Sequence, residues 1–126
     1  MNKKTLRLNW NGYFVYTDNN VHRYAPTKAG VYKIAVKQKA GKLRVRYVGQ
    51  ASNIDRRLNE HLDMENESNE CLADRIKKYL TKFSFAEIGD QDDRNGAELA
   101  LYKHYQPSCN DPDAIPNGPD IEINYQ

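Results

Sequence analysis

Alternation of apolar and polar residues marks three stretches of the chain as β-strands. Two of them lie close together, at residues 31–36 and 43–48, and a less regular one covers residues 82–88. A period of two residues is typical of a strand that buries one face. The six residues between the first two stretches include one glycine, which suits a hairpin loop. The pattern therefore predicts an antiparallel hairpin, followed later in the chain by a third strand.

The pairing of this hairpin decides where two tyrosines lie. If Val36 is opposite Leu43, antiparallel pairing places Tyr32 opposite Tyr47, at the end of the hairpin far from its loop. We therefore expect the two tyrosine side chains to stand next to each other on one face of the sheet. A shift of one residue would break this arrangement.

Helical spacing replaces the alternation after the second strand. Ile54, Leu58 and Leu62 are four residues apart and form one apolar stripe. Similar spacing predicts two further helices, at about residues 70–80 and 94–105. The order strand–strand–helix–helix–strand–helix predicts an α/β fold of the α+β type, a small three-stranded, mostly antiparallel sheet flanked by helices.

The two ends of the chain carry weaker patterns. Residues 1–28 contain two aromatic-rich runs split by Asn11-Gly12, a hairpin-type turn signal, and residues 18–20 have the composition of another turn. We expect this segment to be an N-terminal extension packed on a core domain of residues 29–111. Residues 112–126 are rich in Pro, Asn and Asp and predict a loop with a short extended tail.

Composition narrows the class of protein. No stretch approaches the roughly 20 apolar residues of a membrane span, and the N-terminus lacks a signal-peptide core. These features predict a cytoplasmic protein that does not associate with a membrane. Cys71 and Cys109 are the only cysteines, and neither lies in a CxxC motif or a Cys/His cluster. We therefore expect neither a disulfide framework nor a zinc site.

The charge is distributed unevenly although the net charge is only +2. Residues 1–61 hold 13 Lys/Arg and three Asp/Glu, whereas residues 62–126 hold six and 14. An asymmetry of this size indicates a basic surface with a polyanionic partner. Chance clustering on solvated faces is the alternative.

Four polar side chains lie at spacings that would bring them together. Tyr32 and Tyr47 stand on the predicted hairpin, while Arg57 and His61 are one turn apart on the following helix and share a face. Each carries a polar group that can contact a phosphate. As alternatives, the tyrosines are packing residues, Arg57 forms a surface salt bridge and His61 is structural.

The same residues fall within a longer ordered set of short motifs. In chain order, the set is Gly30-Val31-Tyr32, Tyr47-Val48-Gly49, Arg57, His61, Glu98-Leu-Ala-Leu101 and Pro107-Ser-Cys-Asn110. This order resembles the GIY-YIG endonuclease family, including its E-x-x-L and P-x-x-N patterns. Each tripeptide is common by itself, but the full set in order is specific. The resemblance covers about two thirds of the chain.

The resemblance implies a GIY-YIG nuclease-like fold and a metal-dependent endonuclease that hydrolyses phosphodiester bonds in DNA. It also implies one divalent metal ion, Mg²⁺ or Mn²⁺, held by Glu98. Arg57 then stabilises the phosphate, because a guanidinium stays charged and can bind two oxygens. Tyr32 is the first choice for the group that accepts the proton of the attacking water, with Tyr47 beside it as an orienting residue or alternative base.

The roles of His61 and Asn110 are less specific. His61 is expected to take the proton onward or to hold a tyrosine hydroxyl, and Asn110 to hydrogen-bond Glu98 or the substrate backbone. The expected partner is DNA, in duplex, branched or single-stranded form, and a homodimer stays open. A catalytically silent nucleic-acid-binding module of the same fold and a small α/β interaction protein are the alternatives. The expected nucleic-acid contacts are Lys33, Lys37, Lys39, Lys42, Arg44, Arg46 and Arg56.

Overall fold

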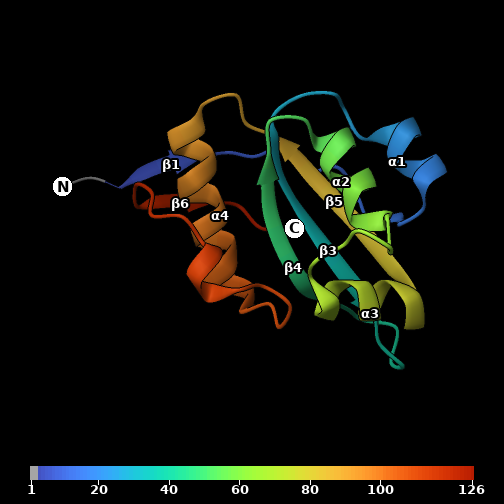
Figure 1. The fold of residues 1–126 in the computed structure, drawn as a ribbon. Coiled ribbons are helices and arrows are strands. Elements are labelled where there is room, and N and C mark those ends of the chain that lie inside the picture. The colour runs from blue at the N-terminus through green and yellow to red at the C-terminus, as the bar shows by residue number, and fades with distance from the viewer. Residues whose placement is uncertain (1–2) are drawn as a thin grey trace.

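A four-stranded antiparallel sheet forms the centre of the computed structural model, which describes residues 3–126 (Figure 1). The strand order is β2-β5-β3-β4. The three predicted strands are present and the α+β class is confirmed, but the sheet has one more strand than expected. The strands are β2 (Phe14–Val15), β3 (Gly30–Lys37), β4 (Leu43–Ala51) and β5 (Thr81–Glu87).

Helices cover both faces of this sheet. The helix α4 (Gln91–Tyr105) lies on one face, and α1 (Asp18–Tyr24), α2 (Ile54–Leu62) and α3 (Glu70–Lys78) lie on the other (Figure 1). Each begins after a side chain that caps its first turn, an arrangement that satisfies otherwise unpaired backbone N–H groups. The capping residues are Thr17, Asn53, Asn69 and Asp90.

Two hydrophobic cores result, one on each face. Alternate residues of β3 point in opposite directions, so that Val31 and Ala35 pack with Leu101 of α4, whereas Ile34 packs with Leu58 of α2. The predicted apolar stripe of α2 therefore does face the sheet. The packing of these two cores fixes the positions of the elements that carry the candidate site.

The N-terminal extension differs from its prediction. The expected turn at residues 18–20 is the first turn of α1, because the Thr17 hydroxyl accepts a hydrogen bond from the Asn20 backbone N–H. The hairpin-type turn signal at Asn11-Gly12 does not mark a hairpin, although a short strand lies on each side of it. The runs on its two sides pair with different partners, since β2 joins β5 whereas β1 (Lys4–Leu6) joins the C-terminal β6 (Ile121–Ile123).

The two ends of the chain therefore lie together. Strands β1 and β6 form a parallel two-stranded sheet beside α4 (Figure 1), and a short 3₁₀ helix, Pro112–Ala114, precedes β6. The Asn124 side chain adds to this pairing, because its amide bonds both the N–H and the C=O of Leu8. Thus the predicted tail packs on the predicted extension. The domain limits at residues 28 and 111 remain a prediction.

The predicted register of the β3–β4 hairpin is wrong. Lys37, not Val36, is opposite Leu43, and Tyr32 is opposite Gly49. A slip of one residue would have separated the two tyrosines, but the register shifts again between Ile34 and Ala35. This bulge leaves Arg46 without a partner on β3 and returns Tyr47 to the face of Tyr32, where the ring centroids are 6.2 Å apart. The two tyrosines are therefore neighbours as expected, although Tyr47 is opposite Ile34 and not Tyr32.

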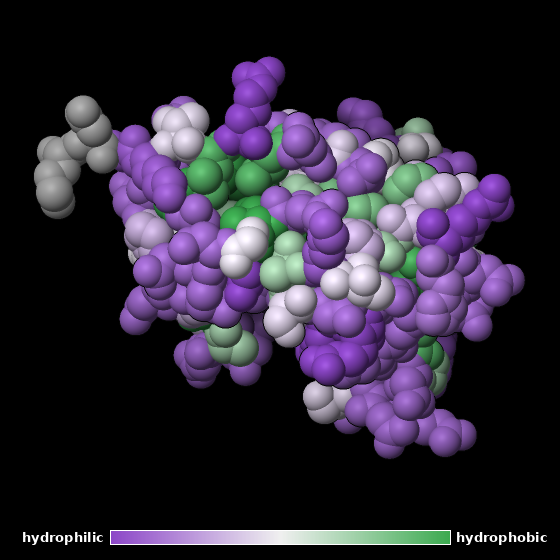
Figure 2. Space-filling view, turned by 90° about the horizontal axis from the view of Figure 1, so that it is seen from above, coloured by the Kyte–Doolittle hydropathy of each residue, from purple (hydrophilic) through white to green (hydrophobic). Residues whose placement is uncertain are grey.

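The outer surface seen from above is predominantly hydrophilic (Figure 2). A group of hydrophobic residues is visible on the side where β1, β6 and α4 lie. Between residues 3 and 126, no helix has the length and apolar character needed to cross a membrane.

Candidate active site

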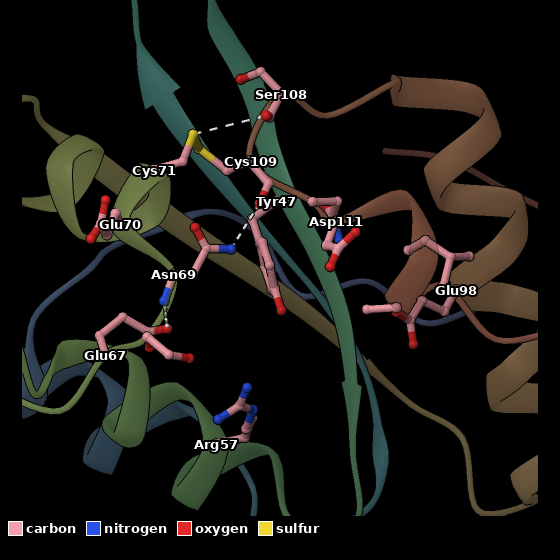
Figure 3. Close-up of a pocket in the computed structure, with 14 residues that line it drawn as sticks. Tyr47, Arg57, Glu67, Asn69, Glu70, Cys71, Glu98, Ser108, Cys109 and Asp111 are labelled. Atoms are coloured by element: carbon pink, nitrogen blue, oxygen red, sulfur yellow. Dashed lines mark hydrogen bonds between the residues drawn. A yellow bond between two sulfur atoms is a disulfide. The ribbon is translucent and has the colours of Figure 1, made fainter.

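A cavity of about 630 Å³ opens between β4, the helices α2, α3 and α4, and the loop that follows α4 (Figure 3). Four of the six predicted catalytic residues line it. They come from separate elements: Tyr47 from β4, Arg57 from α2, Glu98 from α4 and Asn110 from the loop. Residues far apart in the sequence thus meet at one surface, as the motif order predicts.

The other two predicted catalytic residues are buried behind Tyr47. Tyr32 is 1% exposed, and its hydroxyl lies 2.8 Å from Nε2 of His61. The other imidazole nitrogen, Nδ1, lies 2.7 Å from a carboxylate oxygen of Glu67. A carboxylate can only accept, so Nδ1 carries the hydrogen and Nε2 accepts the hydrogen bond from Tyr32.

Glu67 was missed in the sequence analysis. It lies in the acidic segment 63–69, where three carboxylates look equivalent in the sequence. In the structure its side chain is buried and its second oxygen accepts the backbone N–H of Asn69. No local pattern distinguishes it, because its partner is defined only by the packing of the segment against α2.

Burial controls the protonation of these groups. It raises the pKa of Tyr32 well above its usual value of 10.0. It also raises the pKa of Tyr47, against the opposing effect of the positive charge of Arg57. Burial lowers the pKa of His61, although the hydrogen bond to Glu67 acts in the opposite direction. At neutral pH both tyrosines are therefore protonated and His61 is neutral.

Arg57 is available to an anion in the cavity. In the part of the chain that the structure describes, it forms no ion pair, whereas its neighbour Arg56 pairs with Glu60 at 3.8 Å. The surface salt bridge considered as an alternative for Arg57 is absent from this region. A half-buried guanidinium with its charge unneutralised is suited to phosphate oxygens.

Glu98 fits a metal ligand. It is 7% exposed, it forms no ion pair within residues 3–126, and burial raises its pKa against a hydrogen bond from Gln50. No cluster of three or more His, Cys, Asp or Glu suited to a metal occurs in the same residues. One carboxylate at a polar cavity wall suits Mg²⁺, which keeps much of its water and also takes phosphate oxygens.

Asn110 holds the cavity wall in place. Its side-chain amide accepts a hydrogen bond from the Val48 N–H at 2.9 Å and donates one to the Val48 C=O at 2.8 Å. These bonds attach the loop to the open edge of β4. Of the two partners considered for Asn110, Glu98 is not hydrogen-bonded to it, and the amide is held by the strand instead.

A disulfide between Cys71 and Cys109 joins the first turn of α3 to the same loop. The sequence analysis expected no disulfide framework, whereas the structure pairs the two cysteines in one disulfide. Their Cα atoms are 5.2 Å apart, within the range a disulfide can bridge, but their separation of 38 residues gives no sign of this proximity. Asn69 supports the link by donating to the Cys109 C=O at 2.7 Å.

The glycines of the first two motifs are explained by close packing. A Cβ atom on Gly49 would collide with the ring and hydroxyl of Tyr32. A Cβ atom on Gly30 would collide with the Ala86 carbonyl and the Ile54 side chain. The Tyr32 side chain can therefore lie over β4 only because position 49 has no side chain.

The predicted nucleic-acid contacts divide into two groups. Lys42, Arg44 and Arg56 are exposed, and Arg46 is partly exposed. Lys33 is fully buried, with its Nζ 4.1 Å from the Trp10 ring centroid, and burial lowers its pKa to about 8. Its predicted role in nucleic-acid binding is wrong, because its position on β3 directs it to the α4 face of the sheet, under aromatic residues.

Comparison with known proteins supports the resemblance seen in the sequence. Residues 28–110 match the GIY-YIG catalytic domain family. No match was found among curated proteins.

Solved structures give the same fold. One similar structure is the GIY-YIG N-terminal endonuclease domain of UvrC from Thermotoga maritima, a point mutant bound to its catalytic divalent cation. It has a TM-score of 0.54 and 24% identity, over 73% of this chain and 96% of that one. The same domain with magnesium has a TM-score of 0.54 and 23% identity, over 73% and 97%.

Proposed function

The chain belongs to the GIY-YIG family of nuclease domains. On this premise we propose that it is a cytoplasmic, metal-dependent endonuclease that hydrolyses phosphodiester bonds in DNA. One observation carries the proposal: a basic, an acidic and a phenolic side chain meet at one cavity, and neither charged group is neutralised by an ion pair within residues 3–126. These are Arg57, Glu98 and Tyr47.

The scissile phosphate binds between Arg57 and Glu98. Arg57 donates hydrogen bonds to the non-bridging oxygens and stabilises the charge that develops on them. Glu98 holds one divalent cation, Mg²⁺ or Mn²⁺. When bound, this ion supplies Lewis-acid stabilisation to the phosphate and its leaving oxygen.

Tyr47 is our choice for the residue that contacts the attacking water, because it lines the cavity and Tyr32 does not. A tyrosine with a raised pKa is a poor base by itself. The Tyr32 ring, however, stacks beside that of Tyr47 with centroids 6.2 Å apart, and its hydroxyl contacts His61 in turn. Tyr47 accepts the proton of the water and passes its own to Tyr32, which gives one to Nε2 of His61.

Glu67 completes this path. It orients the ring of His61 and stabilises the imidazolium that forms when Nε2 accepts the proton. Throughout the transfer both tyrosines keep a proton, so their raised pKa values do not prevent it. Tyr32, His61 and the Glu67 side chain are buried and Tyr47 is half-buried, so packing holds the path in a fixed geometry.

The DNA backbone contacts exposed cations of the β3–β4 hairpin and of α2, among them Lys42, Arg44 and Arg56. Contacts of this kind are independent of sequence. One cavity cuts one strand at a time, so cleavage of both strands of a duplex requires a homodimer or two successive binding events.

A cleavage assay tests the proposal. Plasmid, single-stranded and branched DNA are incubated with Mg²⁺, Mn²⁺ or EDTA and either the wild type, Glu98→Ala or the control Glu122→Ala, an exposed glutamate on β6. We expect cleavage by the wild type and Glu122→Ala only with metal, and a loss of about 100-fold or more in Glu98→Ala. A wild type that binds DNA but cuts none under any metal would favour the silent binding module.

A further inference from the structure

A second cavity, of about 300 Å³, lies at the other end of α3. It is bounded by the β3–β4 hairpin on one side and the last turn of α3 on the other, and no acidic residue lines it in the described chain. Val36 and Tyr79 form its apolar wall. Gln38 and four cationic side chains line the rest, and the cations are Lys37, Lys39, Arg46 and Arg75.

Both arginines line this cavity and make few side-chain hydrogen bonds to the protein. Nη1 of Arg46 contacts the Ser108 hydroxyl at 3.3 Å, and Nη1 of Arg75 contacts the Asp74 carboxylate at 3.2 Å. The Nε atom of each is buried without a hydrogen-bond partner in residues 3–126. Each guanidinium also has Nη donors beyond these contacts, and these suit a ligand that accepts hydrogen bonds.

The positive charge here exceeds the negative charge. Within residues 3–126, Asp74 is the one carboxylate that forms an ion pair with a lining residue, and it is shared with Lys78 at 2.8 Å. Burial lowers the pKa of Arg46, and the nearby charges of Arg44 and Arg75 add to this shift. Like charges held together in this way are relieved when an anion binds between them.

The β-bulge explains why Arg46 is present in this cavity. Arg46 is the residue left unpaired between Val45 and Tyr47. Bulges turn a side chain away from the regular alternation of a strand. The same irregularity therefore directs Tyr47 to the active-site cavity and Arg46 to the second one.

The two cavities are neighbours along one wall. Cys71 at the start of α3 lines the active-site cavity, and Arg75 and Tyr79 line the second. Arg75 and Tyr79 are four and eight residues after Cys71, which corresponds to ~6 and ~12 Å along the axis at the rise of an α-helix. Nucleotides of a DNA strand are spaced about 3.4 Å along the duplex axis, so this separation corresponds to roughly two to four nucleotides.

We propose that Lys37, Lys39, Arg46 and Arg75 bind a backbone phosphate of the nucleic-acid strand whose scissile phosphate occupies the active-site cavity. The inference rests on the proposed function for the identity of the strand. The site positions the strand without reading its sequence, because all its contacts go to a phosphate. It also explains why Arg75, which lies in the acidic half of the chain, faces the basic hairpin.

This site is tested by measuring DNA binding under conditions in which no cleavage occurs. Fluorescence anisotropy of a labelled oligonucleotide in EDTA, between about 50 and 200 mM salt, gives the slope of log K against log salt. The variant is Lys39→Gln/Arg75→Gln, and the control is Lys77→Gln/Lys103→Gln, which removes two exposed charges outside both cavities. The slope should become less steep by about 0.7–0.9 in the variant only, the effect of one lost phosphate contact.

A second measurement locates the phosphate. Each phosphate of the oligonucleotide is replaced in turn by an uncharged methylphosphonate. One replacement should weaken binding of the wild type but not of the variant, since two changes at one contact are not additive. Lys37→Gln/Lys39→Gln, on the exposed hairpin, repeats the test with α3 intact.

Equal slopes in variant and control, the absence of such a phosphate, or a wild type that does not bind DNA would each overturn the inference. If the slope changes in the variant as expected but the wild type cuts no DNA, the result would support this site and contradict the proposed nuclease activity. The two proposals are therefore separable.

Discussion

The hydrogen bonds of His61 show how single residues define the candidate site. Glu67 fixes the proton on Nδ1 and leaves Nε2 to accept from Tyr32. All three side chains are buried, and Tyr47 lies in front of Tyr32 and His61 at the cavity wall. A buried neutral histidine between a phenol and a carboxylate is suited to taking up a proton for a short time.

The same burial predicts a pH dependence of stability. Burial lowers the pKa of His61, so between that pKa and the unfolded value of about 6.5 the unfolded chain binds more protons than the native one. The stability contributed by neutral His61 is complete above about pH 6.5 and is lost as the pH falls through this window, with a slope of up to about 1.4 kcal/mol per pH unit.

Urea unfolding of the wild type, His61→Asn and the exposed-residue control His104→Asn between pH 5 and 8 measures this effect. The wild type and the control should lose free energy of unfolding more steeply below pH 6.5 than His61→Asn does. Parallel curves for all three proteins would show that burial does not keep His61 neutral.

The loop after α4 shows how elements hold the site together. Gln106 ends α4 in the left-handed conformation, with φ of 47°, and turns the chain back toward β4. The loop is then attached to α3 by the Cys71–Cys109 disulfide and to β4 by Asn110. One wall of the cavity thus depends on contacts between three elements.

Removal of the disulfide should lower the free energy of unfolding by about 2–4 kcal/mol, because the bond closes a long loop in the unfolded chain. The measurement is urea unfolding of the wild type and Cys71→Ser/Cys109→Ser, each with and without reductant. Reductant should destabilise the wild type alone. No difference between the four conditions would mean that the cysteines are not paired in solution, as is usual for cytoplasmic proteins.

Regular elements could be predicted from the sequence because their signals are local. The periodicity of β3, β4, α2 and α3 is visible in windows of a few residues. The strand pairing between β1 and β6 was missed because each strand has three residues and they are more than 100 positions apart. The bulge was missed because alternation continues on both sides of it, so the pattern does not show which residue is unpaired.

The whole molecule brings together residues that no local pattern connects. Tyr32, Arg57 and Glu98 were predicted because the family motifs are local and ordered along the chain. Glu67 and Arg75 were not predicted as site residues, because they meet their partners only when α3 packs beside the hairpin and α2. The positions of α3 and the loop after α4 therefore determine both the cavity and the cationic site next to it.

The rate of DNA cleavage by Tyr47→Phe tests the central claim most directly, because Tyr47 is the phenolic side chain of the path that faces the cavity. Single-turnover cleavage with Mg²⁺ is compared with that of the wild type and of Tyr24→Phe, an exposed tyrosine on α1. We predict that Tyr47→Phe slows cleavage by about 10²–10⁴-fold at unchanged DNA affinity, while Tyr24→Phe matches the wild type. Cleavage by Tyr47→Phe at the wild-type rate would contradict the account.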